Sequence, residues 1–396
     1  FIKKTAPTVV GPTDGEGGSA SGIWTLDQVA DYESQGLWPM PVLDRELYAW
    51  GYNNVGQLGL GDTATRSSPV QVGALVTWSQ MGLGYNHSLA TTTDGKLYAS
   101  GQGSYGKLGL GSTTNYSSPV QVGALTTWSK VTAGEQFTTA VKTDGTLWAW
   151  GDNSVGQLGD GTTTARSSPV QIGALTNWLD TSSGSAFTLA TKTDGTLWAW
   201  GENNQGQLGL GDLTRRSSPV QIGALTTWAN IANGSFHSIV TQTNGTLWAF
   251  GYNAQGALGL GDTTRRSSPV QVGALTTWLQ VAAGLYSTLA IKTDGTLWTW
   301  GYNNAGQLGD GTTVNKSSPV QVGALTTWSK VGGGRTHSLA IKTDGTFWSW
   351  GEGNSGQLGD GSTVAKSSPV QVGALTTWNV LAKSSLGNSS IATIKG

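Results

Sequence analysis

The stretch TLWAWGDNSVGQLGDGTTTARSSPVQIGALTNW, residues 146–178, decides the fold because a close copy of it returns every fifty residues. The first glycine of each copy fixes the register: Gly51, Gly101, Gly151, Gly201, Gly251, Gly301 and Gly351. Seven copies therefore fill the chain from about Leu47 to its end. Such self-similarity indicates an array in which each unit buries its apolar face only by stacking on its neighbours.

Each copy resolves into four β segments. In HSLAIKTDGTFWSW, residues 337–350, two alternating runs flank a Thr-Asp-Gly turn, and Asp-Gly supplies the positive φ angles that a tight hairpin needs. SSPVQVGAL carries its proline at the start of a strand, where the missing N–H does least harm, and WSKV supplies a fourth strand. Four strands in each of seven copies predict an all-β fold, a seven-bladed β-propeller over residues 44–396.

The linked motifs GYNNVGQLGLGD, SSPVQVGAL and TDGTLWAWG carry a family resemblance. Together they resemble the repeat of the regulator-of-chromosome-condensation family, whose members are seven-bladed propellers of about fifty-residue repeats. The resemblance covers roughly residues 44–396. In that family, nucleotide exchange depends on a specialised loop inserted in the propeller, and every copy here keeps the fifty-residue spacing without an insertion.

The two ends of the array are incomplete in complementary ways. Residues 44–50 align with the TDGTLWAW strand, but no preceding strand of that hairpin lies before them. The last copy runs NVLAKSSLGNSSIATIKG after Trp378 and stops where the Asp-Gly turn would be. We therefore expect the N-terminal strand to complete the last blade beside residues 389–395, which removes two open sheet edges.

A leader, residues 1–43, precedes the repeats. It combines a flexible Gly/Ser/Pro connector with one predicted short helix, in which Thr25 is the N-cap of a capping box. A helix of about nine residues does not persist alone in water, so Trp24, Leu26 and Val29 are the candidate anchor. Their partner is the repeat domain itself or another protein, such as a capsid or tail protein. The leader is rich in small residues and runs into GIWTLDQV (residues 22–29) and GLWP (residues 36–39), and in this it also resembles the leaders of structural proteins from marine bacterial viruses.

The composition narrows the choice of partners. Only 11% of the residues are charged and the formal net charge is -1, which gives no general attraction to nucleic acid. The chain has no cysteine, which excludes disulfides and thiolate metal sites. No apolar run approaches the roughly 20 residues of a membrane span, so membrane insertion is not expected.

The histidines do not indicate a metal or catalytic site. His87, His237 and His337 occupy one position in the first, fourth and sixth copies, which the ring holds apart, whereas ligands of one metal must lie close together. No Ser-His-Asp order, paired acidic motif or nucleotide loop interrupts the repetition. We predict no enzyme activity, no catalytic residues, no cofactor and no metal.

Two dinucleotide-type patterns, Gly101 to Gly106 and Gly351 to Gly356, lack the helix that would hold a pyrophosphate. We interpret them as turns. The other five copies have Asn in place of the second glycine, and we expect this Asn to adopt the positive φ of a tight turn.

The tryptophans are predicted to pack neighbouring sheets together. Trp148 and Trp150 sit at i and i+2, so both point to one face of their strand, and other copies repeat the pair. Burying a Trp removes roughly 200 Å² from water, a gross gain of roughly 5 kcal/mol before entropy costs. Trp78 and its equivalents, one per repeat through Trp378, are interpreted in the same way.

One surface feature is not required by folding. The residue before SSPVQ is basic in six of seven copies, namely Arg66, Arg166, Arg216, Arg266, Lys316 and Lys366. The exception is Tyr116. An acidic position lies at the Asp-Gly turns, on what we expect to be the opposite face of the ring. Arg215 and Arg265 double the basic position, and we expect Arg215, Arg216, Arg265 and Arg266 to form an arc of the rim that no acidic residue interrupts. This arc is the candidate binding site for an acidic glycan or an acidic protein surface.

These features together favour a non-enzymatic binding or structural module. We predict a propeller displayed on a virus particle or an extracellular surface and attached through its leader, in a capsid-decoration, tail-associated or adhesion role. The alternative is an intracellular regulator, resembling other members of the family, that binds a GTPase or chromatin.

Overall fold

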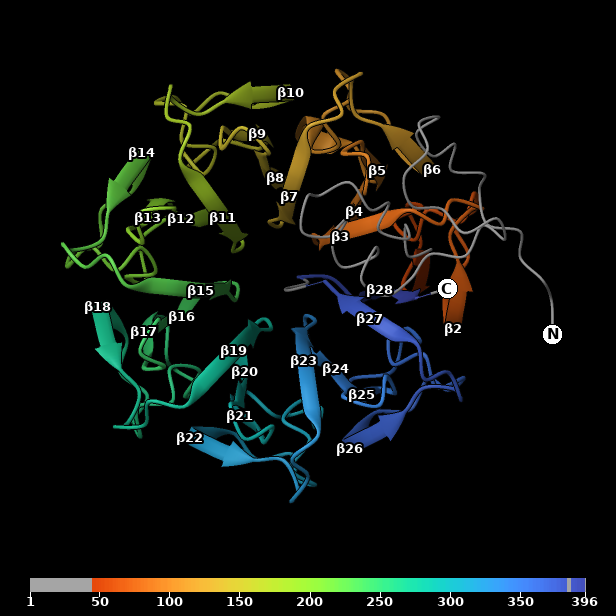
Figure 1. The fold of residues 1–396 in the computed structure, drawn as a ribbon, viewed down its shortest axis with the longest axis vertical. Coiled ribbons are helices and arrows are strands. Elements are labelled where there is room, and N and C mark those ends of the chain that lie inside the picture. The colour runs from red at the N-terminus through yellow and green to blue at the C-terminus, as the bar shows by residue number, and fades with distance from the viewer. Residues whose placement is uncertain (1–44, 383–385, 396) are drawn as a thin grey trace, which may run out of the picture. The chain divides into compact units, whose positions relative to one another are not determined.

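The computed structural model describes residues 45–382 and 386–395, which form seven four-stranded antiparallel sheets arranged in a ring (Figure 1). Residues Asp44–Gly396 make up one compact unit. The predicted seven-bladed propeller is confirmed. The leader helix and its candidate anchor residues Trp24, Leu26 and Val29 lie outside the described residues.

Within each blade the strands follow one order, with the first strand nearest the centre of the ring and the fourth at its outer rim (Figure 1). The first strands are β3 (Trp78–Leu83), β7 (Trp128–Ala133), β11 (Trp178–Ser183), β15 (Trp228–Asn233), β19 (Trp278–Ala283), β23 (Trp328–Gly333) and β27 (Trp378–Leu381). The second strands are β4 (His87–Thr92), β8 (Phe137–Lys142), β12 (Phe187–Lys192), β16 (His237–Gln242), β20 (Ser287–Lys292), β24 (His337–Lys342) and β28 (Ser389–Lys395). The third strands are β5 (Leu97–Gly101), β9 (Leu147–Gly151), β13 (Leu197–Gly201), β17 (Leu247–Gly251), β21 (Leu297–Gly301), β25 (Phe347–Gly351) and β1 (Arg45–Gly51). The fourth strands are β6 (Tyr116–Gln121), β10 (Arg166–Gln171), β14 (Arg216–Gln221), β18 (Arg266–Gln271), β22 (Lys316–Gln321), β26 (Lys366–Gln371) and β2 (Arg66–Gln71).

We number as blades 1 to 6 the sheets that begin with β3, β7, β11, β15, β19 and β23. The closing blade joins the two ends of the array in the order β2-β1-β28-β27. Arg45 pairs with Lys395 and Gly51 with Ser389, in an unbroken antiparallel register. The predicted closure by the N-terminal strand is confirmed, and β2 adds the outer strand of the same blade.

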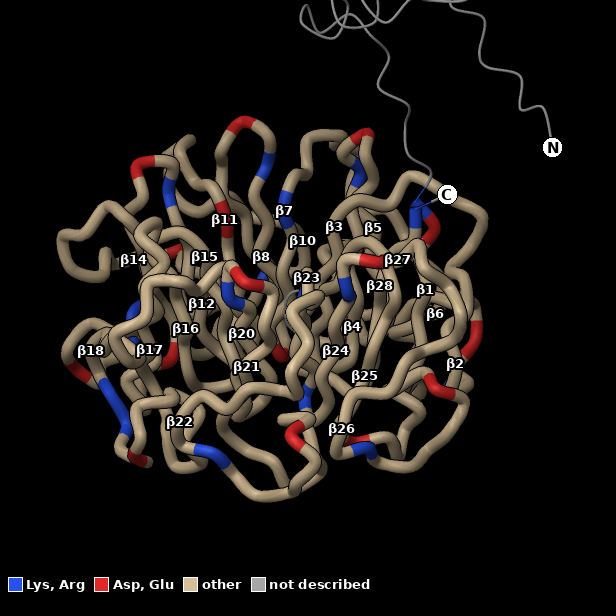
Figure 2. The backbone as a smooth tube through the Cα atoms, turned by 60° about the horizontal axis from the view of Figure 1, so that its bottom comes forward, with Lys and Arg blue, Asp and Glu red and all other residues tan. Residues whose placement is uncertain are grey.

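The ring has two different faces. The turn face carries the Asp-Gly hairpin turns, and the loop face carries the long glycine-rich loops that connect third to fourth strands. Arg166 pairs with Gly151 at the loop-face end of β9, whereas Asp144 precedes the other end of that strand. The basic and acidic positions therefore lie on opposite faces, as predicted. Charges of both signs are interspersed on each face (Figure 2).

Tryptophan side chains of five third strands bind neighbouring blades together. The fully buried Trp150 donates its indole Nε1–H to the main-chain oxygen of Lys107, in the loop of the preceding blade, over 3.0 Å. Thr138 donates its hydroxyl to the same oxygen over 2.9 Å. Equivalent indole bonds are made by Trp50, Trp200, Trp300 and Trp350. The predicted packing role is confirmed, and these residues also satisfy a buried carbonyl.

The asparagines of the glycine-rich loops do not adopt the positive φ that we expected. Among the described non-glycine residues, Tyr105 alone has positive φ, and it lies in a short 3₁₀ turn, η1 (Ser104–Gly106). Asn153 instead is fully buried, and its side chain donates to the main-chain oxygen of Thr162 while accepting from the N–H of Leu158. The prediction was wrong because the residue is selected for these side-chain bonds across the loop, which turn propensity does not reveal.

No helix among the described residues is long and apolar enough to cross a membrane.

Candidate functional site

The loop face carries a cluster of aromatic side chains that interrupts the repetition. We call Phe236, Tyr252, Tyr286 and Tyr302 the aromatic cluster. Residues equivalent to Phe236 and Tyr286 are Asn86, Gln136, Ala186, Thr336 and Asn388. Residues equivalent to Tyr252 and Tyr302 are Tyr52, Gln102, Asp152, Glu202 and Glu352. Four aromatic residues thus gather in blades 4 and 5, where the other copies are mostly polar.

Tyr286 is the centre of this cluster. Its ring stacks on Phe236 at a centroid distance of 6.2 Å and lies 5.3 Å from Tyr252 and 6.4 Å from Tyr302. All four side chains are half-buried. Main-chain hydrogen bonds join the segments that carry these side chains. The Tyr252 N–H donates to the main-chain oxygen of Phe236 over 2.9 Å, and the Tyr302 N–H donates to that of Tyr286 over 2.9 Å.

A chain of main-chain hydrogen bonds around the axis supports the cluster from below. The residues that precede the second strands donate in turn from one blade to the next: Glu135 to Ser185, Ser185 to Ser235, Ser235 to Leu285, Leu285 to Arg335 and Arg335 to Gly387, all over 3.1–3.2 Å. Phe236 and Tyr286 directly follow two members of this chain. The aromatic side chains therefore stand on a rigid support, which lowers the entropy cost of binding a partner.

Charged groups border the cluster. Burial raises the pKa of Tyr286, and the nearby Tyr252 raises it further, while Arg335 opposes the shift. Glu135 also raises the pKa of Tyr286. Arg335 itself lies 5.0 Å from the centre of the Tyr85 ring, in cation–π geometry. The cluster thus has an aromatic centre and a rim of mixed charge.

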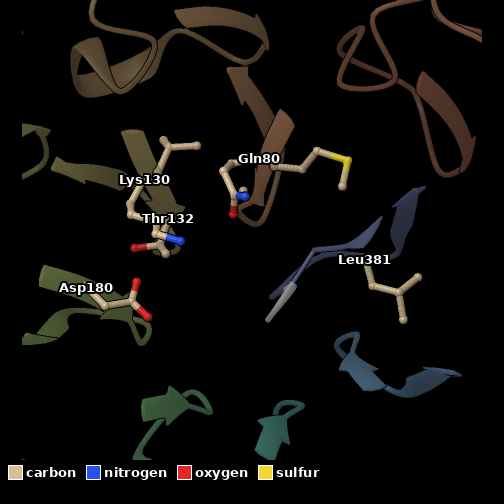
Figure 3. Close-up of a pocket in the computed structure, with 8 residues that line it drawn as sticks. Gln80, Lys130, Thr132, Asp180 and Leu381 are labelled. Atoms are coloured by element: carbon tan, nitrogen blue, oxygen red, sulfur yellow. The ribbon is translucent and has the colours of Figure 1, made fainter. Parts of the chain in front are cut away.

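A small cavity lies among the first strands. A cavity of about 20 Å³ is lined by first-strand residues that include Gln80, Lys130, Thr132, Asp180 and Leu381 (Figure 3). This volume holds about one water molecule. This cavity is therefore too small to hold a larger ligand.

The arginines of the predicted arc have acidic partners. Arg216 binds Asp212 over 2.6 Å and Arg266 binds Asp262 over 2.6 Å, each within its own loop. Arg215 lies 3.7 Å from Glu202 of the same loop. The expectation that no acidic residue interrupts the arc is therefore wrong. Sequence reasoning missed these pairs because the aspartates lie four residues upstream in a loop whose path was unknown.

Arg265 contacts the neighbouring blade. It donates from Nη1 to the main-chain oxygen of Asn204, in the preceding blade, over 3.3 Å. The pKa of Asp262 is held below its ordinary value by the Thr264 N–H and then by Arg266, so this carboxylate stays ionised beside its partner. The arc is a nearly neutralised surface with one cation reaching across a blade boundary.

The three histidines are buried parts of the inter-blade contacts. His237 Nε2 lies 3.1 Å from the Thr288 hydroxyl of the next blade, and His87 and His337 make equivalent contacts with Thr138 and Ser390. Burial lowers the pKa of His237 to about 4. No group of metal-binding side chains occurs in the part of the chain that the structure describes. These contacts make the histidines part of the packing between neighbouring blades.

Lys107 is a second break in the repetition that the sequence analysis overlooked. Five other copies have Gln at this position and one has Ala257. The Lys107 side chain is fully buried, and Nζ donates to the side-chain oxygen of Gln102 over 2.7 Å and to that of Gln136. Burial lowers its pKa to about 8. Comparing each position across the copies would have found both Lys107 and the aromatic cluster.

Comparison with known families decides what this array is. The regulator of chromosome condensation (RCC1) repeat matches residues 44–91, 94–141, 144–191, 194–241, 244–291, 294–341 and 344–390. The chain belongs to the RCC1 repeat family. A second RCC1 repeat description matches five segments, the first at residues 78–107. The matched units begin before the third strands, so each RCC1 repeat spans parts of two blades.

Solved structures show the same RCC1 fold. Human WBSCR16 superposes with a TM-score of 0.79 at 18% identity, covering 89% of this chain and 99% of that chain. Prp20p from Saccharomyces cerevisiae, described with its binding to Gsp1p and histones, gives 0.77 at 20% identity over 93% of this chain and 94% of that one. Yeast RCC1 (Prp20) bound to Kap60 gives 0.78 at 19% identity, covering 99% and 97%.

Proposed function

We propose that this RCC1-family chain is a non-enzymatic binding module that holds a protein partner on the aromatic cluster of its loop face. The observation that carries the proposal is the gathering of Phe236, Tyr252, Tyr286 and Tyr302 at positions that are mostly polar in the other copies. Folding does not require it, since blades with polar residues there have the same strands. Partly exposed aromatic residues inside a charged rim are typical of the centres of protein interfaces.

The sister copies supply the substitutions for the test. Phe236→Gln and Tyr286→Thr install the residues of blades 2 and 6, so the double variant should fold like the parent chain. The control is Tyr52→Gln, at an equivalent position outside the cluster. We expect a purified partner from the native source to bind the control like wild type and the double variant at least about 30-fold more weakly, as for hot-spot residues. Equal binding by all three proteins would refute the proposal.

For the biological setting we favour a display module on a virus particle or an extracellular surface, attached through the leader. The described chain begins at Arg45, on the turn face, because β1 runs from that face toward the loop face. A tether that joins there leaves the aromatic cluster on the opposite face. The leader residues Trp24, Leu26 and Val29 supply the apolar contacts to a capsid, tail or surface protein.

The anchoring part is tested in the native assembly. Replacing Trp24 and Val29 by Ser should reduce incorporation of the chain into the particle or surface fraction while the melting temperature stays unchanged. Unchanged incorporation would eliminate the anchoring role and leave the binding role of the loop face standing.

Family membership supports a second candidate, an intracellular regulator that binds a GTPase or chromatin. Prp20p, with the same fold, was described with binding to Gsp1p and histones. This candidate predicts that the full chain accelerates nucleotide release from a small GTPase of its own source or retains histones on a column. If it does neither while the aromatic cluster still binds a partner, the display module is favoured.

A further inference from the structure

Three equivalent grooves open on the outer side of the ring, fifty residues apart in the sequence. They lie between blades 2 and 3, 3 and 4, and 4 and 5, with volumes of about 450, 400 and 400 Å³. Each is lined by the glycine-rich loop and outer-strand end of one blade. The first-strand Trp, the third-strand Trp and the outer Ser-Pro pair of the next blade complete it. The grooves are independent of the aromatic cluster on the loop face.

The groove between blades 3 and 4 shows the chemistry most clearly. Trp228 and Trp248 meet edge-on at a centroid distance of 6.0 Å, and Leu225 stands beside them with 48% of its surface exposed. The exposed Ser268 and the side chain of Gln221 supply polar groups at the margins. None of the side chains that line this groove is charged.

Such a lining matches a ring that is apolar on its faces and carries hydroxyls around its edge. A pyranose has this character, since its C–H faces stack on indole and its hydroxyls bond to amide and hydroxyl groups. We infer that the three grooves bind neutral sugar residues of a repeating polysaccharide. Because the grooves recur at the blade period, one polymer can occupy more than one groove, which raises its affinity without new contacts.

The outer strands argue against an extended peptide as the occupant. A peptide that adds to a sheet edge needs a continuous row of main-chain partners. Pro219, Pro269 and Pro319 interrupt that row in the three outer strands concerned, because proline has no N–H.

The three grooves differ in their charged residues, since Asp160 and Arg166 line the groove between blades 2 and 3 and Lys292 lines the one between blades 4 and 5. The lysine beside the third-strand Trp provides an internal comparison. Lys192 Nζ lies 3.7 Å from the ring centre of Trp198, and Lys292 Nζ lies 3.7 Å from that of Trp298. The equivalent residue in blade 4 is Gln242, and no described Lys or Arg covers the Trp248 ring. We therefore expect the groove at Trp248 to bind most tightly, because a sugar there does not compete with a bound ammonium group.

The experiment uses the full chain and a fixed panel of neutral polysaccharides: laminarin, dextran, yeast mannan and a soluble galactan, each with its monosaccharide. Affinity electrophoresis and calorimetry should show binding to at least one polymer, about 10-fold tighter than to its monosaccharide. Gln242→Lys should weaken that binding at least about 3-fold while retaining the packing found in blades 2, 3, 5 and 6. Leu225→Ala should also weaken it, whereas Leu279→Ala, at a residue 54% exposed outside the three grooves, should not.

Two results would overturn the assignment. One is an absence of binding to every polymer in the panel, and the other is binding that Gln242→Lys and Leu225→Ala leave unchanged. A proline-rich decapeptide serves as the competing probe. If the decapeptide binds the full chain, and if Gln242→Lys and Leu225→Ala both weaken that binding, the grooves are peptide sites and the sugar assignment is wrong.

Discussion

Trp50 donates its indole Nε1–H to the main-chain oxygen of Gln357 over 2.9 Å, although 307 residues separate them in the sequence. Trp50 belongs to β1 of the closing blade, and Gln357 belongs to the loop of blade 6. The bond is equivalent to the one between Trp150 and Lys107, which are 43 residues apart. The closing interface therefore contains the same indole–carbonyl hydrogen bond as the internal interfaces.

Removing the closing strand should open the ring. Deleting residues 1–50 takes away nearly all of β1, which pairs with both β28 and β2, so two strands lose their partners. We expect aggregation or loss of cooperative unfolding in calorimetry, because exposed edges invite association. Deleting only residues 1–22 should leave the melting transition nearly unchanged. A 1–50 deletion that melts like the full chain would contradict the closure.

The buried tryptophans of the third strands should tolerate Phe better than Ala. Trp150→Ala removes a fully buried side chain and its inter-blade bond, and should lower the free energy of unfolding by about 3–5 kcal/mol. Trp150→Phe should cost about 1–2 kcal/mol, mainly the lost hydrogen bond, because Phe250 fills the equivalent site in blade 4. Denaturant titration measures the free energy of unfolding of both variants. Equal losses would contradict the expectation that Phe fills this site as Phe250 does in blade 4.

The buried histidines should make the protein sensitive to acid. The pKa of His237 falls from its ordinary value of 6.5 to about 4 on burial, so between these values the unfolded chain binds a proton that the folded chain does not. Stability is thus complete above pH 6.5 and falls as the pH drops toward 4, by up to about 3 kcal/mol for this residue.

The matched variant is His237→Phe, because Phe137 and Phe187 occupy the equivalent sites. Its melting temperature should fall less than that of wild type between pH 6.5 and pH 4. Parallel curves for the two proteins would rule out His237 as a source of the acid sensitivity.

Replacing Lys107 by Gln, the residue of five other copies, should stabilise the protein at neutral pH. Burial lowers the pKa of Lys107 from 10.5 to about 8, so below pH 8 the folded chain holds a charged group at a cost of up to about 3 kcal/mol. The cost diminishes as the pH rises from 8 to 10.5. The gain of Lys107→Gln in melting temperature should therefore be largest near pH 7 and shrink above pH 9; a constant difference would point to packing instead of charge.

The arginine arc should contribute little to folding. Arg215→Ser with Arg265→Ser leaves the pairs Arg216–Asp212 and Arg266–Asp262 in place, so stability should change by less than about 1 kcal/mol. If the arc binds an acidic glycan or protein, this double variant should elute from a heparin column at lower salt than wild type. Identical elution would remove Arg215 and Arg265 from the candidate binding residues.

The sequence alone determined the architecture, because the evidence for it is local and repeated. The Asp-Gly turns, the proline at the fourth strand and the fifty-residue period each constrain the same unit, and the incomplete ends showed that β1 must join residues 389–395. The tryptophan positions likewise predicted packing between blades. Only the tertiary structure revealed that their partners are carbonyls of the preceding loop.

The surface chemistry was decided by contacts between residues that no spacing rule connects. The path of the glycine-rich loop brings Asp212 to Arg216 and reduces the charge of the predicted arc. The ring joins Phe236 to Tyr252 and Tyr286 from different strands and blades, and it forms the grooves between neighbouring sheets. The residues shared by all copies specify the strands. A binding surface instead depends on which residues that differ between copies lie close together, and only the closed ring determines their positions.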